Sequence, residues 1–273
     1  MRQALVWVFL LCNTSVFSFA SDTYNLRLAD IRSLGLGGNE VTQSSLFNPA
    51  LVAFNTIRNA ELGYFNRYGL KELSSGYFSV NYPNQYLSAA VNISTFGYEK
   101  YRESLFRFPL AKKLSDRWWL GVSVQYALLQ TVLYEEQQVS RLSTDVGILF
   151  NPVDNLLIGL LISDLPSVRF GDNIASDNSN TPYFIQLGFQ WDIINSLLIT
   201  CSAKYDDEAN VCPDFGIEYK PYEQFMFRMG MRGTPLTPSF GVGYVHSFIH
   251  VNTVFMYHSI LGVSSGIGLA FSF

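Results

Sequence analysis

The sequence predicts an all-β protein, a transmembrane outer-membrane barrel of about fourteen antiparallel strands. Three observations lead to this fold class. The first residues read as an export signal, bulky apolar residues alternate with small or polar ones along the remainder, and no apolar run reaches the ~20 residues of a membrane-spanning helix. Only 15% of the 273 residues are charged and 48% are hydrophobic, whereas soluble domains carry about 25% charged residues.

Residues 1–20 match a cleaved signal peptide. Arg2 supplies the positive charge, residues 4–11 form the apolar core, and Ser18 and Ala20 are the small residues before the cleavage point. A lipoprotein signal at Cys12 is the alternative, but Leu11 stands where that signal has a small residue. We expect residues 59–273 to form the barrel, located in the bacterial outer membrane, and residues 21–58 to be a separate segment before it.

Alternation in the predicted strands distinguishes a barrel from a soluble β-sandwich. In a strand every second side chain shares a face. Along 183–191, one face carries Tyr, Ile, Leu, Phe and Trp, and the other carries mainly Gln and Gly. The outer face of a soluble sandwich is normally rich in Lys, Glu and Thr. The thin, glycine-rich second face found here favours a narrow lumen.

The same alternation repeats along the chain and predicts the strand order. The expected strands are 61–68, 74–82, 86–96, 103–110, 117–129, 139–150, 156–165, 181–191, 196–206, 211–219, 224–232, 238–247, 250–258 and 264–273. Uncertain strand ends leave twelve as the alternative count. Short turns alternate with longer links, as expected for periplasmic turns and external loops.

A motif of a different kind precedes the first strand. It combines Arg32 with three glycines, Gly35, Gly37 and Gly38, and about ten residues later reads Asn48-Pro49-Ala50. This N-terminus resembles that of PorV/PorQ-type proteins of Bacteroidetes, within the wider FadL-like superfamily of outer-membrane barrels. The resemblance covers about 25 residues, and it implies a fourteen-stranded barrel with the N-terminal segment, residues 21–58, folded into the lumen as a plug or hatch.

The motif residues support a plug on their own chemistry. Glycines allow backbone to pass close to a wall. Pro49 favours the start of a short helix with Asn48 as its N-cap. The alternative is a periplasmic tail that merely precedes the barrel.

Eight charged residues fall on the predicted inner face of the strands. One interpretation is a polar conduit that selects a solute. The other, which we favour, is a network of ion pairs that fills the lumen, because buried charges must be paired and both signs are similarly frequent. These residues are Glu103, Arg107, Asp145, Lys204, Asp214, Glu218, Arg228 and Arg232.

Several function classes are excluded or disfavoured. The formal net charge is −4 and Lys/Arg residues are not clustered, which argues against a nucleic-acid partner. We find no nucleophile motif, and the spacing of His246, His250 and His258 matches no recognised metal set. We therefore expect no enzyme activity, catalytic residue, metal or other cofactor.

Two functions remain, both implied by the resemblance. The favoured one is a docking component of an envelope or type IX-like secretion machinery, because little chain is left for substrate-capturing external loops. The alternative is a FadL-like transporter that passes long-chain fatty acids or other hydrophobic molecules through a kinked wall; for such a gap in the wall the sequence offers only strand prolines such as Pro213. The expected partners are outer-membrane lipid, the barrel-assembly machinery, envelope or secretion proteins, and a hydrophobic ligand.

The final residues supply the first testable prediction. Phe271 and Phe273 end an alternating strand and resemble the signal that barrel-assembly machinery recognises. Phe273→Ser is expected to reduce the amount of folded protein in the outer membrane, measured by heat-modifiable migration of membrane fractions. Unchanged insertion of this variant would contradict the assembly role.

Overall fold

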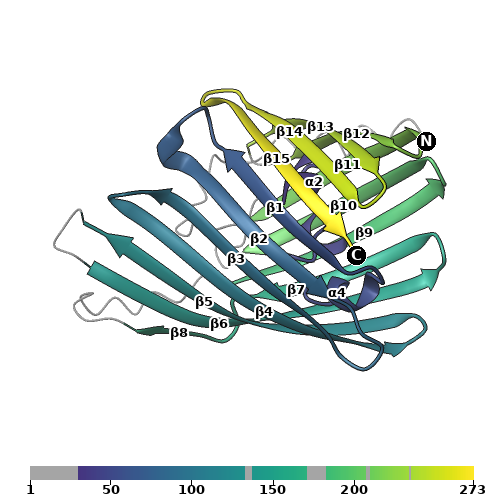
Figure 1. The fold of residues 1–273 in the computed structure, drawn as a ribbon, viewed down its shortest axis with the longest axis horizontal. Coiled ribbons are helices and arrows are strands. Elements are labelled where there is room, and N and C mark those ends of the chain that lie inside the picture. The colour runs from purple at the N-terminus through teal and green to yellow at the C-terminus, as the bar shows by residue number, and fades with distance from the viewer. Residues whose placement is uncertain (1–29, 133–136, 171–182, 207–209, 234) are drawn as a thin grey trace.

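We analysed a computed structural model that describes residues 30–273 except 133–136, 171–182, 207–209 and 234. Strands dominate the chain, and every strand pair in the sheet is antiparallel (Figure 1). The strands are Asn59–Asn66 (β1), Ser74–Tyr82 (β2), Ser88–Tyr98 (β3), Tyr101–Ser115 (β4), Trp118–Thr131 (β5), Gln137–Val153 (β6), Leu156–Ser163 (β7), Ser167–Phe170 (β8), Phe184–Ile194 (β9), Leu197–Asp206 (β10), Val211–Tyr222 (β11), Phe225–Arg232 (β12), Thr237–His246 (β13), Ile249–His258 (β14) and Gly262–Ser272 (β15). A 3₁₀ turn, η1 (Lys71–Leu73), joins β1 to β2.

The sheet closes on itself because β1 pairs with both β2 and β15. Tyr64 lies opposite Ile267 in this last pair, and the Phe273 amide donates to the Arg58 carbonyl at 3.0 Å beyond its end. The result is a closed antiparallel barrel of fourteen wall strands, with β7 and β8 as two parts of the seventh. Closure satisfies strand backbone groups that lipid cannot solvate.

The seventh wall strand is interrupted between β7 and β8. Both parts pair with β6, but Asp164 between them has a positive φ of 64° and Pro166 has no amide proton to donate. Thr144 of β6 bridges the interruption, because its amide donates to the Pro166 carbonyl and its carbonyl accepts from the Leu165 amide. On the other side β9 pairs with β7, and no pairing joins β8 to β9 among the described residues.

The two faces of the wall differ as the alternation predicts. On β9, Leu187 and Phe189 are exposed on the outer face, while Gln186 between Ile185 and Leu187 is buried inside. The same arrangement of bulky apolar side chains outside recurs on β1, β3, β5, β12 and β15. An apolar band of this kind is what a barrel presents to lipid. No helix in the described part of the chain is long and apolar enough to cross a membrane.

The fourteen predicted strand segments are confirmed, and the differences lie at their ends. β4 and β6 run further than expected, to Ser115 and Val153. The seventh segment, predicted as 156–165, ends at Ser163 where the wall is interrupted. The wall has no gap at Pro213, because β11 continues through this residue, which lies opposite Ala203. The predicted signal peptide, residues 1–20, and residues 21–29 of the predicted plug lie outside the described residues.

The outward position of Phe189, in the middle of β9, gives a test of the lipid-facing band. Phe189→Arg is expected to lower the free energy of unfolding by about 2–4 kcal/mol, the cost of an arginine at the centre of the bilayer. Urea unfolding of the barrel in phospholipid vesicles measures this, with Phe189→Leu as the matched control. Equal stability of the two variants would place this face away from lipid.

Candidate functional site

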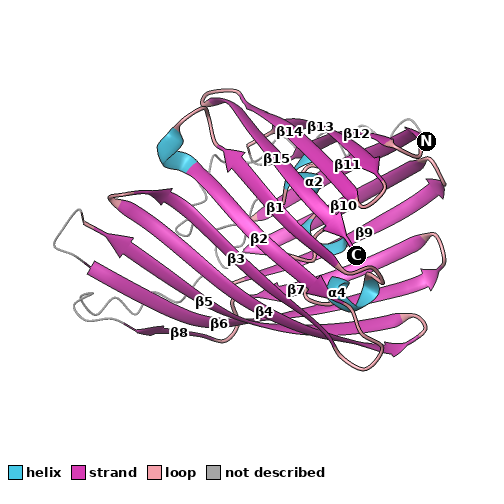
Figure 2. Ribbon diagram, in the orientation of Figure 1, coloured by secondary structure: helices cyan, strands magenta, loops and turns pink. Residues whose placement is uncertain are grey.

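The interior of the barrel is occupied by the segment that precedes β1, which we call the inner segment (residues 30–55). It contains three short helices, Ile31–Gly35 (α2), Glu40–Gln43 (α3) and Leu51–Phe54 (α4). α2 contacts β12 to β15 and β1, α3 contacts β7 and β9, and α4 contacts β3 to β5. Figure 2 shows the labelled helices within the outline of the strands. Contacts to every side of the wall and near-complete burial place this segment in the lumen.

Side chains within the inner segment hold its turns. Asp30 caps α2 by accepting from the amides of Arg32 at 2.9 Å and Ser33 at 3.4 Å. Asn39 caps α3 by accepting from the Thr42 amide at 3.1 Å. Such caps matter for short helices, because helices of one turn have few hydrogen bonds of their own.

Asn48 has a different role from the one predicted. α4 begins at Leu51 with Ala50 as its cap residue and no side-chain cap, so neither Asn48 nor Pro49 starts the helix. The Asn48 side chain accepts from the Ala50 amide at 3.0 Å and donates to the Val41 carbonyl at 2.7 Å. Asn48 thus joins the loop before α4 to α3 and folds the segment back on itself.

Glycines of the wall provide the space for this segment. Gly121 lies opposite Gly147 across β5 and β6, and Gly216 lies opposite Gly230 across β11 and β12. A Cβ on Gly147 would stand 1.9 Å from the Asn48 side-chain oxygen, and one on Gly230 would stand 2.1 Å from the Gly37 amide. Any larger side chain at these positions collides with the inner segment.

The glycines of the segment motif complete the same contact from inside. Gly37 and Gly38 both have positive φ, 79° and 99°, which other residues adopt at a cost. A Cβ on Gly37 would stand 2.4 Å from the Phe215 carbonyl oxygen. The Gly35 carbonyl accepts from the Ser239 hydroxyl at 3.3 Å. The backbone between α2 and α3 therefore lies directly on the wall.

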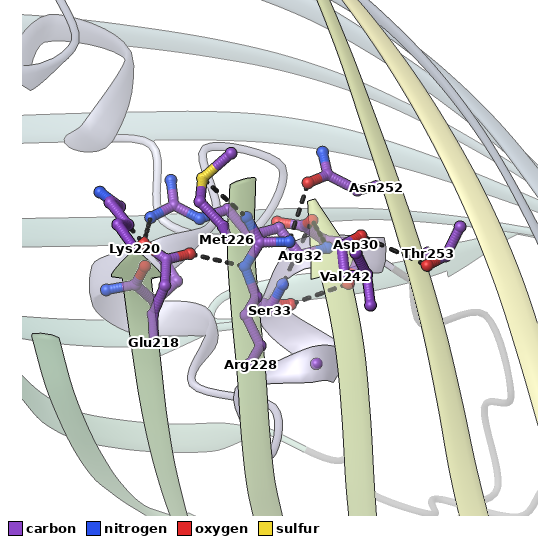
Figure 3. Close-up of polar contacts among 12 residues, drawn as sticks. Asp30, Arg32, Ser33, Glu218, Lys220, Met226, Arg228, Val242, Asn252 and Thr253 are labelled. Atoms are coloured by element: carbon purple, nitrogen blue, oxygen red, sulfur yellow. Dashed lines mark hydrogen bonds and ion pairs between the residues drawn. The ribbon is translucent and has the colours of Figure 1, made fainter. Parts of the chain in front are cut away.

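Three cations converge on Glu218, which is fully buried on β11 (Figure 3). Arg228 donates to this carboxylate at 2.6 Å, Lys220 at 3.2 Å and Arg32 of the inner segment at 3.4 Å. Arg228 also donates to Asn252 at 2.8 Å. Glu218 therefore joins α2 to β11, β12 and, through Arg228, β14.

These contacts and burial shift the pKa values of Arg32, in α2, and of Asp30, which caps α2. The Glu218 carboxylate raises the pKa of Arg32 above its ordinary value, so that Arg32 stays protonated. Burial raises the pKa of Asp30, and this effect outweighs the lowering by its hydrogen bonds and by Arg32.

A second ionic group surrounds Arg232 of β12. Its guanidinium lies 3.5 Å from the Asp214 carboxylate and 3.8 Å from that of Glu40 in α3. It also donates to the Gly37 carbonyl at 3.3 Å. The inner segment is thus held by charge on both sides of its glycine turn.

A third group lies beside the interruption of the wall. Arg107 of β4 pairs with the fully buried Asp145 of β6 and donates to the backbone carbonyls of Leu46 and Phe47 in the inner segment. Asp164, at the interruption itself, accepts from the Arg141 guanidinium at 3.2 Å. The inner segment and the interrupted strand therefore share one polar group.

All eight predicted inner-face charges are buried or half-buried, and six of them form the ion pairs just described. Glu103 instead accepts from the Tyr101 hydroxyl, and the Lys204 ammonium lies 4.3 Å from the centre of the Phe184 ring. The motif residues Gly35, Gly37, Asn48 and Ala50 all lie against the wall. Phe273 is exposed at the end of the last strand.

Sequence reasoning missed several members of these groups. Arg141 lies four residues before Asp145 on the same strand, so the alternation alone assigns it to the inner face. The predicted strand 211–219 ends before Lys220, whereas β11 includes this residue. Asp164 follows the inward-facing Ser163 and reaches the lumen only because its backbone changes direction. No metal-binding cluster of His, Cys, Asp and Glu occurs within the described residues.

Comparison with known proteins finds no matching protein-family profile and no matching curated protein. Solved structures do match in fold. The toluene transporter TodX of Pseudomonas putida superposes with a TM-score of 0.67 at 11% sequence identity, covering 88% of this chain and 97% of TodX. The monoaromatic hydrocarbon channel CymD gives a TM-score of 0.65 at 13% identity, with 88% and 96% covered.

A FadL homologue from Pseudomonas aeruginosa gives a TM-score of 0.55 at 14% identity, covering 87% of this chain and 94% of the homologue. Identities this low carry information on fold alone. This chain therefore shares the fold of these three barrels.

Proposed function

We propose that this protein is an outer-membrane channel for hydrophobic small molecules, in which the inner segment acts as a plug and the interrupted seventh strand as the site of passage through the wall. The interruption carries the proposal, because among the described residues β8 pairs with β6 alone, whereas β7 pairs with both β6 and β9, and a lipid-facing wall normally pairs every strand on both sides. It corresponds to the kinked wall that the FadL-like resemblance implies. TodX and CymD, which share the fold, are channels for toluene and monoaromatic hydrocarbons by their names.

An apolar cluster inside the barrel supports a hydrophobic solute. Leu46 and Phe47 of the inner segment belong to it, together with Leu161 of β7 and Phe184 of β9. The last two lie close to the interruption, because Phe184 pairs with Ser163, the final residue of β7. Hydrocarbon between the plug and the wall would be surrounded by side chains of its own polarity.

The docking role predicted from the sequence has no comparable support. TodX and CymD, which share the fold, are a transporter and a channel by their names, which favours the transporter and a protein without enzyme activity. The lack of long external loops, which had favoured docking, is compatible with a route through the wall, because solute then need not be captured above the barrel. We propose outer-membrane lipid and a hydrophobic ligand as its direct partners, with assembly machinery acting during insertion.

A reversible disulfide between α2 and β15 tests this function through its effect on the uptake of hydrophobic solutes. A Cβ on Gly268 would stand 3.3 Å from the Ile31 Cβ, close to the ~3.5–4.5 Å of a disulfide. Ile31→Cys/Gly268→Cys, with Cys201 and Cys212 replaced by Ala, is expected to slow uptake of radiolabelled toluene or oleate by cells, and reductant is expected to restore it.

The two single-cysteine variants are the controls, because they change the same positions without a cross-link. Uptake no faster than in cells without the protein, for either probe, would overturn the proposed function. Equal uptake in the oxidised and reduced double variant would show that α2 need not move.

The plug role has a separate test at the wall. Gly147→Leu is expected to displace the loop around Asn48 and raise ion conductance across a planar bilayer, because its side chain would occupy the space of that loop. Gly76→Leu is the matched control, since a Cβ there meets only the Gly63 carbonyl oxygen at 3.7 Å. Conductance as low as in the control would mean that the segment does not close the lumen.

A further inference from the structure

The buried carboxylate of Asp145 forms an ion pair and several hydrogen bonds with residues of different elements. It pairs with Arg107 and accepts from the Ser163 hydroxyl, the Gln125 amide at 3.2 Å and the Asp164 backbone amide at 3.0 Å. These donors come from β4, from the end of β7, from β5 and from the interruption. Asp145 itself has no exposed surface.

Two of these connections lead to different functional elements. Through Arg107, Asp145 reaches the carbonyls of Leu46 and Phe47 in the inner segment. Through Ser163 and the Asp164 amide, it holds the point where the seventh strand changes direction. The ion pair of Arg107 with Asp145 thus links the plug to the interruption.

From this arrangement we infer that Asp145 is a positioning residue that couples the loop 44–48 of the inner segment to the interruption at 164–166. The inference rests on the proposed function for its purpose, but not for its geometry. If loop 44–48 leaves its place, Arg107 loses its carbonyl acceptors and can follow the loop or turn wholly to Asp145. Either change alters the ion pair of Arg107 with the Asp145 carboxylate, which orients the Asp164 amide.

The surroundings make the coupling specific to this residue. Asp164 accepts from Gln125 at 2.5 Å, Ser143 at 2.9 Å and Arg141 at 3.2 Å. These bonds hold the interruption to β5 and β6, but none of them reaches the inner segment. Asp164 is therefore a matched neighbour that lies in the same group without joining the two elements.

Charge-assisted hydrogen bonds make this link strong. A carboxylate that accepts from a guanidinium and three further donors in a buried site forms bonds roughly twice as strong as neutral ones. Coupling of two elements requires that a change at one be felt at the other, and a shared buried group with such bonds provides this physically.

The test measures backbone hydrogen exchange of the purified full-length protein in lipid nanodiscs, with no solute present. Asp145→Asn is expected to speed exchange on the order of tenfold at both 44–48 and 164–168, the effect of losing a charged hydrogen-bond acceptor. Asp164→Asn is expected to speed exchange at 164–168 alone. Acceleration confined to one region in Asp145→Asn would overturn the inference.

A second variant keeps the test valid if Asp145→Asn folds poorly. Asn48→Ala removes the bonds of the loop to Val41 and Ala50 and touches no residue of the interruption. It is expected to speed exchange at 164–168 when Asp145 is present and to add nothing in the Asp145→Asn background. No change at 164–168 in Asn48→Ala alone would refute the coupling, whereas failure of uptake in the wild-type protein would refute only the proposed function.

Discussion

The structure depends on one steric constraint: the lumen is filled by the chain's own N-terminal segment, and the wall must leave room for it. Glycines such as Gly147 and Gly230 stand where any Cβ would meet that segment. Several of them face each other across neighbouring strands. Glycine is unfavourable in strand interiors, so the wall gives up strand stability to accommodate its contents. The shape of the inner face therefore matches that of residues 30–55.

Charge then fixes the orientation of the segment within that space. Each of three ionic groups joins the wall to a different part of the segment: Glu218 to α2, Arg232 to the glycine turn and α3, and Arg107 to the loop before α4. Burial makes unpaired charges expensive, so each group favours the one arrangement in which its partners meet. The third group also reaches the interrupted strand, so the placement of the segment and the shape of the wall are fixed by shared residues.

The sequence predicts the wall far better than the site. Alternation repeats in fourteen segments, so errors at single residues do not affect the strand order, and inward charges such as Asp145 and Arg228 follow from the same period. The interruption could not be predicted, because it depends on the backbone of Asp164, a residue that the period assigns to the lipid face. The contacts of Arg107 with the inner segment could not be predicted either, because their acceptors are backbone carbonyls. The resemblance placed the segment in the lumen but gave none of its contacts.

The inner segment contacts both the early and the late strands of the barrel. α4 meets β3 to β5, which follow it closely in the chain, whereas α2 meets β12 to β15, which come last. The barrel then closes by joining β15 to β1. Closure therefore brings together the early and the late strands that contact the segment, and the wall encloses residues that precede its first strand.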